Sequence, residues 1–457
     1  MSKASICSGK SAIVNVELFK GKKVLVMGLG KFGGGLDCAV FASDAGADVL
    51  VTDLAEKSKL QDALGKLSGI SNIQYRLGEH LESDFANTDI VIVNPAVPPG
   101  NKFVKIAEDA GALITSQIEI FFQLCPAQIV GITGANGKST TTALTHHLLK
   151  AGDRKVFLGG NIGNRPLLSI LDEISGNDIV VLEISSFQTE QLERIGKAPY
   201  VSVITNLTPN HLDRHGTFKA YCDAKEVLFT KQQKPCVSIF NGEDEITAGW
   251  FDKYCDDDGR QCFKYAADDV GDEMKKHFKL AGKMNLSNLA AALCVAKQFD
   301  IKDDAIADAL ESFTPLPDRL EFVAEIDGVK WYNDSISTTP TSTIAALEAF
   351  DQPKIIIAGG YDKGLPFDEL GRVIVTNAKA AVLIGAIAEK IAECIETAGG
   401  CKIVNAASME EAVKACSEIA TCGDVVLMSP ACASYDMFDN YKQRGQAFKG
   451  SVTGLKS

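Results

Sequence analysis

Short apolar runs recur along the chain, and most are followed at once by glycine, proline or a polar side chain. Helical-looking stretches separate them. Strands that alternate with helices predict parallel sheets, and therefore an α/β protein. One hairpin, turned by Asp327-Gly328, is expected at residues 321–333. The other expected strands are residues 23–27, 47–53, 89–93, 128–130, 178–183, 200–206, 354–358, 380–384 and 424–428, and the expected helices are residues 36–45, 102–110, 141–150, 285–299 and 303–313.

The order of these elements predicts three domains. Residues 1–116 are expected to form a Rossmann-like domain with a parallel sheet. Residues 117–317 are expected to form a central α/β domain of the P-loop ATPase type, which ends in the proline-containing linker 314–317. Residues 318–457 are expected to form a second Rossmann-like α/β domain.

Charge and composition exclude some classes of function. The 457 residues include 46 basic and 59 acidic side chains, a net charge of −13. Binding of nucleic acid or of an anionic membrane is therefore not expected, because both need a basic face. Thirteen cysteines without a Cys-x-x-Cys pair are typical of reduced thiols. No apolar run reaches the length of a membrane span and no signal peptide is visible, so we expect a cytoplasmic protein.

The most informative motif, residues 131–140, reads Gly-Ile-Thr-Gly-Ala-Asn-Gly-Lys-Ser-Thr. It joins an apolar strand to a helix, where backbone N–H groups and the helix N-terminus bind a triphosphate. Lys138 adds a positive charge, and the hydroxyl of Ser139 or Thr140 is a candidate Mg²⁺ ligand. Glycine recurs at every third position, whereas the standard motif has glycine where this chain has Ile132. The candidate nucleotide-binding residues are Thr133, Gly134, Ala135, Asn136, Gly137, Lys138, Ser139 and Thr140.

Three further candidates follow in the same block. Glu183 ends an apolar strand, where a carboxylate beside a P-loop would bind Mg²⁺; a cap for the next helix is the alternative. Residues 206–216 hold two of the six histidines, and His211 is either a ligand or a structural side chain. Lys225 lies on the following helix, where its spacing alone predicts a solvated cation.

The first block carries a glycine-rich turn, Gly28-x-Gly30-x-x-Gly33, with Asp53 twenty residues later. This spacing is typical of a dinucleotide site in which the acidic residue binds a ribose. An NAD(P)-binding oxidoreductase is therefore an alternative function. A tight turn without a cofactor and a phosphate site for another nucleotide remain open as well.

The roles of three polar residues before and after the linker at residues 314–317 each have two interpretations. Asn285 and Asn288 either approach the P-loop domain or act as a helix cap and a surface amide. Arg319 either clamps a phosphate from the third block or is a surface arginine. Three motifs of the third block follow strands, at the sheet edge where open α/β sheets bind ligands: Asp334-Ser335, residues 359–364 and residues 429–434.

Taken together, these motifs closely resemble those of the Mur ligases, the ATP-dependent amino-acid ligases of peptidoglycan precursor synthesis. The resemblance extends from about residue 21 to about residue 448. Within the family, residues 185–188 and 429–445 are most similar to the glutamate-adding enzymes. The motifs that carry the resemblance are residues 131–140, Leu182-Glu183, Ser185-Ser186, Asn210-His211, Asn285 with Asn288, Arg319 and Asn333-Asp334-Ser335.

The resemblance implies addition of glutamate to UDP-N-acetylmuramoyl-L-alanine through an acyl phosphate made with ATP. It implies a monomer that has only small-molecule partners and closes by a hinge of the third block. Lys138, Glu183, His211 and Lys225 would form the catalytic set. Ser139 and Glu183 would hold one Mg²⁺ ion, and His211 and a carbamylated Lys225 would hold a second.

The resemblance also assigns binding residues. They are Asn288, Arg319 and Asp334 for the nucleotide, Gly28, Gly30 and Gly33 for UDP, Asn161 and Ser185 for the muramoyl part, and Thr338, Lys363, Ser434 and Tyr441 for glutamate. Two departures stand out. Ile336 replaces a lysine of well-known members, and Lys31-Phe32 with Leu54-Ala55 replace small polar and basic residues near the uracil. Both D-glutamate and L-glutamate remain open as substrates.

Overall fold

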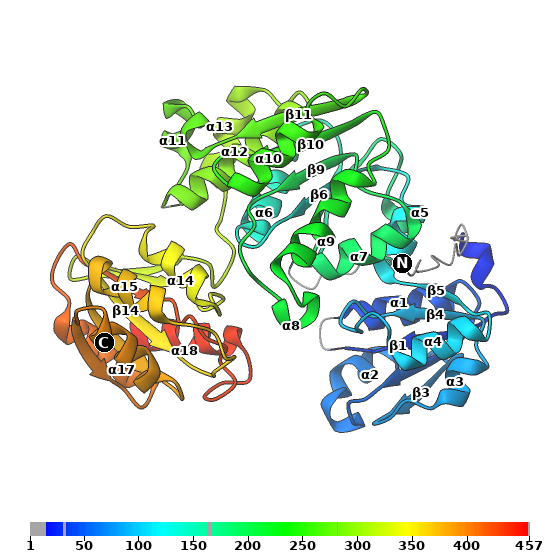
Figure 1. Cartoon of the computed structure of the whole chain (residues 1–457), viewed down its shortest axis with the longest axis horizontal. Helices are drawn as coiled ribbons and strands as arrows, with labels where there is room; N and C mark the ends of the chain where they lie inside the picture. Colours follow the sequence, from blue (N-terminus) through cyan, green and yellow to red (C-terminus); the bar gives the residue numbers. More distant parts are fainter. Residues whose placement is uncertain (1–14, 31–32, 163–166, 281, 456–457) are drawn as a thin grey trace, which may run out of the picture. The chain divides into compact units, whose positions relative to one another are not determined.

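The computed structural model describes residues 15–30, 33–162, 167–280 and 282–455, which form three sheets (Figure 1). Backbone contacts group the chain into two compact units. One unit holds residues 1–266 and 290–306, and the other holds residues 267–289 and 307–457. The three α/β sheets confirm the expected fold class, whereas the boundaries at residues 116 and 317 stay predictions.

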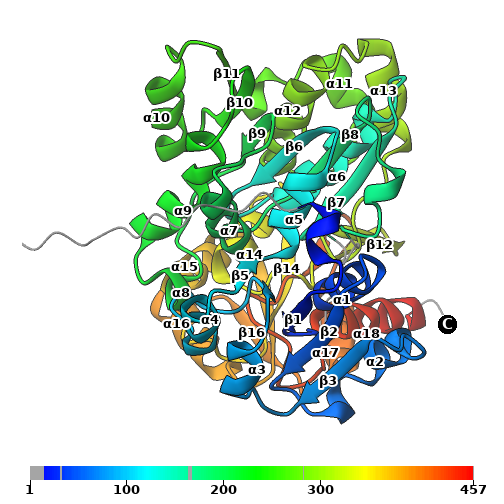
Figure 2. The same ribbon diagram turned by 90° about the vertical axis from the view of Figure 1, so that its right-hand side faces the viewer.

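The first sheet is parallel and has the strand order β3-β2-β1-β4-β5 (Figure 2 shows β1, β2 and β3 side by side). Its order reverses between β1 and β4, which is where doubly wound sheets bind ligands. The strands are β1 (Lys23–Met27), β2 (Asp48–Asp53), β3 (Ile73–Leu77), β4 (Ile90–Val93) and β5 (Leu113–Thr115). The helices are α1 (Gly34–Asp44), α2 (Gln61–Leu67), α3 (Glu82–Ala86), α4 (Lys102–Asp109) and α5 (Gln117–Leu124).

The second sheet is also parallel, in the order β11-β10-β9-β6-β8-β7. Its strands are β6 (Gln128–Thr133), β7 (Val156–Gly160), β8 (Ile179–Glu183), β9 (Val201–Ile204), β10 (Cys236–Asn241) and β11 (Arg260–Tyr265). Between residues 134 and 320 of the chain, the helices are α6 (Lys138–Leu149), α7 (Ser186–Ile195), α8 (Leu212–His215), α9 (Phe218–Thr230), α10 (Glu245–Tyr254), α11 (Asp272–His277), α12 (Lys283–Lys297) and α13 (Asp303–Ser312).

The first two sheets belong to one compact unit and are joined by a buried carboxylate on α1. Asp37 accepts backbone hydrogen bonds from Leu167 (2.9 Å) and Leu168 (2.7 Å), and the side-chain amide of Gln117 donates to it at 2.7 Å. Carboxylates that accept several N–H bonds are strong acceptors. Asp37 therefore links the first domain to the second.

The third sheet has the order β12-β13-β17-β14-β15-β16, and only the β12–β13 hairpin in it is antiparallel. Alternate residues of β14 enter different cores: Ile355 and Ile357 pack on one face, and Ile356 on the other. The strands are β12 (Glu321–Ile326), β13 (Val329–Asn333), β14 (Lys354–Gly359), β15 (Ala378–Ile384), β16 (Lys402–Asn405) and β17 (Val425–Met428). The helices are α14 (Pro340–Leu347), α15 (Asp368–Asn377), α16 (Ala388–Thr397), α17 (Met409–Ile419) and α18 (Tyr441–Gly454).

All strands expected from the sequence are present, including the hairpin, with ends shifted by at most three residues. Six strands were not expected: β3, β5, β7, β10, β11 and β16. All but β10 lie at a sheet edge, and edge strands such as β3, with the sequence Ile-Gln-Tyr-Arg-Leu, mix apolar and polar side chains. The cysteines in the described ranges are free thiols, as expected, and only Cys255 and Cys422 among them are exposed. No helix of the described chain is long and apolar enough to cross a membrane.

A buried carboxylate joins the segments that follow β13 and β17. Asp334 is only 4% exposed. It accepts hydrogen bonds from the Ser429 hydroxyl at 2.7 Å and from the Leu320 backbone N–H at 3.2 Å. Burial nevertheless dominates, and it raises the pKa of Asp334 from 3.8 to about 6.

Asp334→Asn is expected to remove a pH dependence of stability. Between about pH 4 and about pH 6 the folded protein keeps a proton on Asp334 that the unfolded chain has lost, so this group lowers the free energy of unfolding by up to about 3 kcal/mol as the pH rises. Urea unfolding of both proteins at several pH values measures this. The lost hydrogen bonds add a constant offset, so only the pH-dependent part of the difference is diagnostic. A difference that does not change with pH would contradict the burial argument.

Candidate active site

The P-loop is held by the segment that follows β9. The Thr205 hydroxyl and the Asn206 side-chain amide donate to the Asn136 carbonyl at 2.6 and 3.1 Å. The Asn206 carboxamide oxygen accepts from the Asn136 N–H at 2.9 Å, and the Asn206 carbonyl accepts from the Ala135 N–H at 2.8 Å. Because these bonds fix Ala135 and Asn136, the middle of the loop is shaped before any ligand arrives.

Each glycine of the repeated pattern has its own physical reason. A Cβ on Gly131 would collide with the Pro199 ring and lie 2.9 Å from Ile184. Gly134 has φ +143°, and a Cβ there would collide with the Thr205 hydroxyl. Gly137 has φ +81° at the N-cap of α6, a conformation that glycine adopts without strain. The three-residue spacing therefore follows from two close approaches and one left-handed turn.

The P-loop leads into α6, and the Lys138 side chain at the start of this helix folds back over the loop. The Lys138 ammonium donates to the Ala135 carbonyl at 2.7 Å, and Ser139 is buried in the first turn of the helix. The 12-residue helix directs its positive dipole end at the loop. This arrangement can bind a phosphate chain through backbone N–H groups and one lysine.

Glu183 fits a cation ligand. It ends β8, is 2% exposed, and accepts a hydrogen bond from the Asn161 amide at 3.0 Å through Oε1. Its other oxygen, Oε2, is buried and has no hydrogen-bond partner. Because a buried carboxylate oxygen without a partner is costly, this atom is suited to a metal ion. Glu183 does not cap α7: the Ser185 hydroxyl and the Gln188 amide form that capping box.

Lys225 is not the solvated cation that its spacing predicts. It is 1% exposed, and its ammonium nitrogen lies 3.1 Å from the Thr133 hydroxyl at the end of β6. Burial, and then the neighbouring charge of Lys138, hold the pKa of Lys225 well below its usual range, although Glu183 acts in the opposite direction. The tertiary structure thus brings Lys138, Glu183 and Lys225 close enough to influence one another.

His211 lies near this group, across an aromatic side chain. It is exposed and sits at the N-cap of α8 with φ +51°. Its ring is 6.5 Å from that of Tyr221, and the Lys225 nitrogen lies 4.9 Å from the same Tyr221 ring. The described residues contain no cluster of three or more His, Cys, Asp or Glu side chains that could hold a metal ion.

His215, the second histidine of this segment, is structural, and sequence reasoning did not separate it from His211. Its Nε2 lies 3.0 Å from the Ser186 hydroxyl, and its Nδ1 lies 3.2 Å from a Glu190 oxygen. Arg214 pairs with Glu190 and stacks 4.8 Å above the Phe187 ring. These contacts hold α8 against the first turns of α7.

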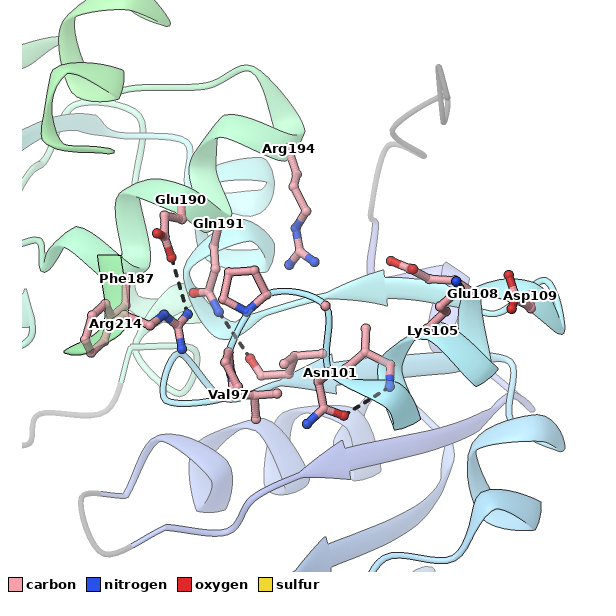
Figure 3. Close-up of a pocket in the computed structure, with 15 residues that line it drawn as sticks. Val97, Asn101, Lys105, Glu108, Asp109, Phe187, Glu190, Gln191, Arg194 and Arg214 are labelled. Atoms are coloured by element: carbon pink, nitrogen blue, oxygen red, sulfur yellow. Dashed lines mark hydrogen bonds and ion pairs between the residues drawn. The ribbon is translucent and has the colours of Figure 1, made fainter. Parts of the chain in front are cut away.

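A cavity of about 420 Å³ lies between α7 and the loop that follows β4 (Figure 3). Pro98, Pro99 and Asn101 line it from the loop, and Phe187 and Arg214 line it from the other side. Figure 3 shows Arg214 directed at Glu190 on α7. None of the predicted binding residues lines this cavity.

In the first domain, Asp53 forms hydrogen bonds with the backbone of the glycine-rich turn itself. Gly28, Gly30 and Gly33 all have positive φ. The Asp53 carboxylate accepts the backbone N–H groups of Leu29 at 2.9 Å and Gly30 at 3.2 Å. Asp53 therefore supports the turn, and its spacing needs no ribose to explain it. Residues 31–32, noted above near the uracil, lie outside the described residues.

The predicted glutamate and nucleotide residues of the C-terminal unit gather on neighbouring segments. Thr338 follows β13, the exposed Lys363 follows β14, and the buried Ser434 follows β17. The Tyr361 N–H donates to the Ala433 carbonyl at 2.9 Å, which joins the last two segments. The Ser335 hydroxyl donates to the carbonyl of Tyr441 at 2.7 Å.

The remaining nucleotide candidates are not surface groups. Asn285 and Asn288 are 5% and 3% exposed, and the Asn288 amide donates to Asn285 at 3.2 Å, so the surface-amide alternative is wrong. Arg319 is half-buried, and its positive charge favours the ionised form of Asp334. Ile336 is half-buried, and its N–H donates to the Asp318 carbonyl at 3.2 Å. Direct ligand contacts of all these residues stay predictions.

Models of known protein families match all three domains. The MurD-like N-terminal domain of Mur ligases matches residues 22–116, the Mur ligase middle domain residues 132–296, and the Mur ligase glutamate ligase domain residues 318–432. The chain is 39% identical to a UDP-N-acetylmuramoylalanine–D-glutamate ligase of Roseiflexus sp., over 94% of this chain and 98% of the relative. It is 38% identical to the enzyme of that name from Clostridium acetobutylicum, over 96% and 98%.

Solved structures agree on the fold. MurC of Thermotoga maritima, a UDP-N-acetylmuramate-alanine ligase, has a TM-score of 0.61 at 19% identity and covers 95% of this chain and 100% of its own. MurF of the same organism, solved with ADP, has a TM-score of 0.59 at 19% identity and covers 97% and 98%. The family models and the full-length relatives together show that this chain belongs to the Mur ligase family.

Proposed function

We propose that the chain is an ATP-dependent ligase that joins D-glutamate to UDP-N-acetylmuramoyl-L-alanine. The observation that carries the proposal is a preformed P-loop beside two buried ionisable side chains, Glu183 and Lys225. The nearly full-length relatives named D-glutamate ligases support the choice of substrates. We propose a cytoplasmic monomer that acts on small molecules.

The reaction has two steps. The substrate carboxylate attacks the γ-phosphorus of ATP, ADP leaves, and an acyl phosphate forms. The amine of glutamate then attacks the acyl carbon to give a tetrahedral intermediate, which collapses to the amide as inorganic phosphate leaves and the amine loses a proton. The positive dipole end of α6 and the Lys138 ammonium neutralise the negative charge that the phosphates carry during the first step.

We propose that two Mg²⁺ ions bind beside the P-loop. Ser139 and the unpartnered oxygen of Glu183 would hold one ion, and His211 with a carbamylated Lys225 would hold the other. Such ions neutralise phosphate oxygens and polarise the group under attack. The chain itself supplies the orientation, since the Asn161 amide fixes the other Glu183 oxygen at 3.0 Å.

The surroundings of Lys225 favour the carbamate. Its amine is buried beside the Lys138 cation, and its lowered pKa favours the neutral form, the one that attacks CO₂. Attack forms an N–C bond and releases one proton, which converts a potential cation into an anionic oxygen ligand. The Lys138 charge, which opposes an ammonium at this position, would stabilise that anion.

The first domain is proposed to bind UDP through the turn of Gly28, Gly30 and Gly33, with Asn161 and Ser185 at the muramoyl part. The use of Asp53 within the turn removes the ribose argument for NAD(P). Thr338, Lys363, Ser434 and Tyr441 are proposed to bind glutamate, and Asn288, Arg319 and Asp334 the nucleotide. The Lys363 ammonium suits a carboxylate of glutamate.

Phosphate release in the presence of ATP, Mg²⁺ and UDP-N-acetylmuramoyl-L-alanine tests the substrate assignment. D-Glutamate is expected to support turnover, whereas L-glutamate and other amino acids give only background. Faster turnover with L-glutamate would overturn the stereochemical assignment. Background release with every amino acid would overturn the proposed function.

Lys138→Ala is expected to lower turnover by about a thousandfold or more, because charge stabilisation at the transferred phosphoryl group is lost. The melting temperature reports whether the fold survives the change. Lys150→Ala, at the other end of α6, is the control and is expected to keep wild-type activity. A folded Lys138→Ala protein with wild-type turnover would contradict the P-loop assignment.

Lys225→Ala is expected to be inactive and to regain part of its activity with added formate or acetate, since a short carboxylate replaces the carbamate oxygens. Lys219→Ala is the control, because this lysine lies on the same helix but is exposed and paired with Asp223. An active Lys225→Ala protein would contradict the carbamate. So would the absence of rescue together with a mass spectrum of freshly prepared wild-type protein that excludes CO₂ addition.

A further inference from the structure

Arg444 on α18 is a buried guanidinium that the proposed chemistry does not use. It is 1% exposed, and within the described chain the carboxylates of Asp436, Asp318 and Asp334 favour its charge from a distance, although none forms an ion pair with it. Burial lowers the pKa of Arg444 to about 10, so the group still carries its charge at neutral pH. A buried unpaired charge is strongly unfavourable unless hydrogen bonds offset the loss of water.

The hydrogen bonds of Arg444 run to two segments at the carboxyl edge of the third sheet. Its Nε donates to the Ser335 hydroxyl at 3.1 Å, and its Nη2 donates to the carbonyls of Ser335 at 2.8 Å and Cys432 at 3.0 Å. Ser335 follows β13 and Cys432 follows β17, which are neighbouring parallel strands. One side chain therefore sets the distance between the two segments.

A third segment packs on the same guanidinium. Nη1 has no hydrogen-bond partner, and a Cβ built on Gly360 would lie 3.3 Å from it. Gly360 follows β14, and the next residue, Tyr361, is hydrogen-bonded to Ala433. The segments after β13, β14 and β17 thus meet around Arg444.

These three segments carry the residues proposed for glutamate. Thr338 lies after β13, Lys363 after β14 and Ser434 after β17, and Tyr441 begins the helix that carries Arg444. We propose that Arg444 is a positioning residue for the amino-acid substrate. Its guanidinium holds the three glutamate-binding segments in place relative to one another. This inference rests on the proposed function.

The geometry demands arginine rather than any cation. Three donated bonds leave from two nitrogens of one plane, toward acceptors on different segments. A lysine ammonium offers donors from a single atom and cannot reproduce this fork. Arg444→Lys therefore keeps the charge and removes the link between the segments.

The test is steady-state kinetics of Arg444→Lys. The KM for glutamate is expected to rise about tenfold or more, as for loss of one or two bonds from a charged donor, while the KM for ATP changes by less than about twofold. Arg372→Lys, the same exchange at an exposed arginine of α15, is the control and is expected to match the wild type. An unchanged KM for glutamate, or equal rises for glutamate and ATP, would overturn the inference.

A second readout needs no turnover. Amide hydrogen exchange of residues 335–338, 359–364 and 429–434 is expected to be faster in Arg444→Lys than in the wild type, with β14 and β17 unchanged. Should Arg444→Lys fail to fold, Ser335→Ala removes the hydroxyl that accepts from Nε and donates to the Tyr441 carbonyl, and it keeps both Nη2 bonds. This variant is expected to raise the KM for glutamate about threefold, and no rise would overturn the inference. A wild-type protein without glutamate-dependent turnover but with the expected exchange difference would overturn the proposed function and leave the link between the segments standing.

Discussion

The close approach between β6, with the loop that follows it, and the residues on either side of β9 is the constraint on which the nucleotide site depends. Gly131 and Gly134 leave room for Pro199 and the Thr205 hydroxyl, and Asn206 then holds the loop through its backbone and its side chain. Because the donors are fixed in advance, binding of phosphate need not order the loop. The unusual glycine spacing is thus a packing requirement of this sheet.

Three of the predicted site residues share a buried ionisable side chain. Glu183, Lys225 and Asp334 are all less than 5% exposed, and each has a perturbed pKa or an oxygen without a partner. Such groups lower stability in the isolated protein, because water solvates them better than a protein interior does. They are tolerated where a ligand supplies the missing partner, which is the pattern expected of a site for metal and phosphate.

Structure and sequence assign different roles to the first domain. The spacing from Gly33 to Asp53 is typical of a dinucleotide site. The Asp53 carboxylate, however, accepts hydrogen bonds from backbone N–H groups of the turn that precedes α1. A motif defined by spacing alone cannot distinguish these uses, since both place an acidic residue at the end of β2. Membership of the Mur ligase family, shown by the full-length relatives, agrees with the structural interpretation.

The sequence by itself determined the central strands other than β10, the β12–β13 hairpin and the P-loop, because apolar runs and glycine turns are local signals. It also placed Glu183 and Ser434 at strand ends, where ligands bind. Only the tertiary structure decided that Lys225 is buried beside Lys138, that His215 is structural, and that Arg444 joins three segments. Burial and pairing depend on residues as far as 109 positions apart, as in the Arg444–Ser335 bonds, and no local pattern encodes which of them will meet.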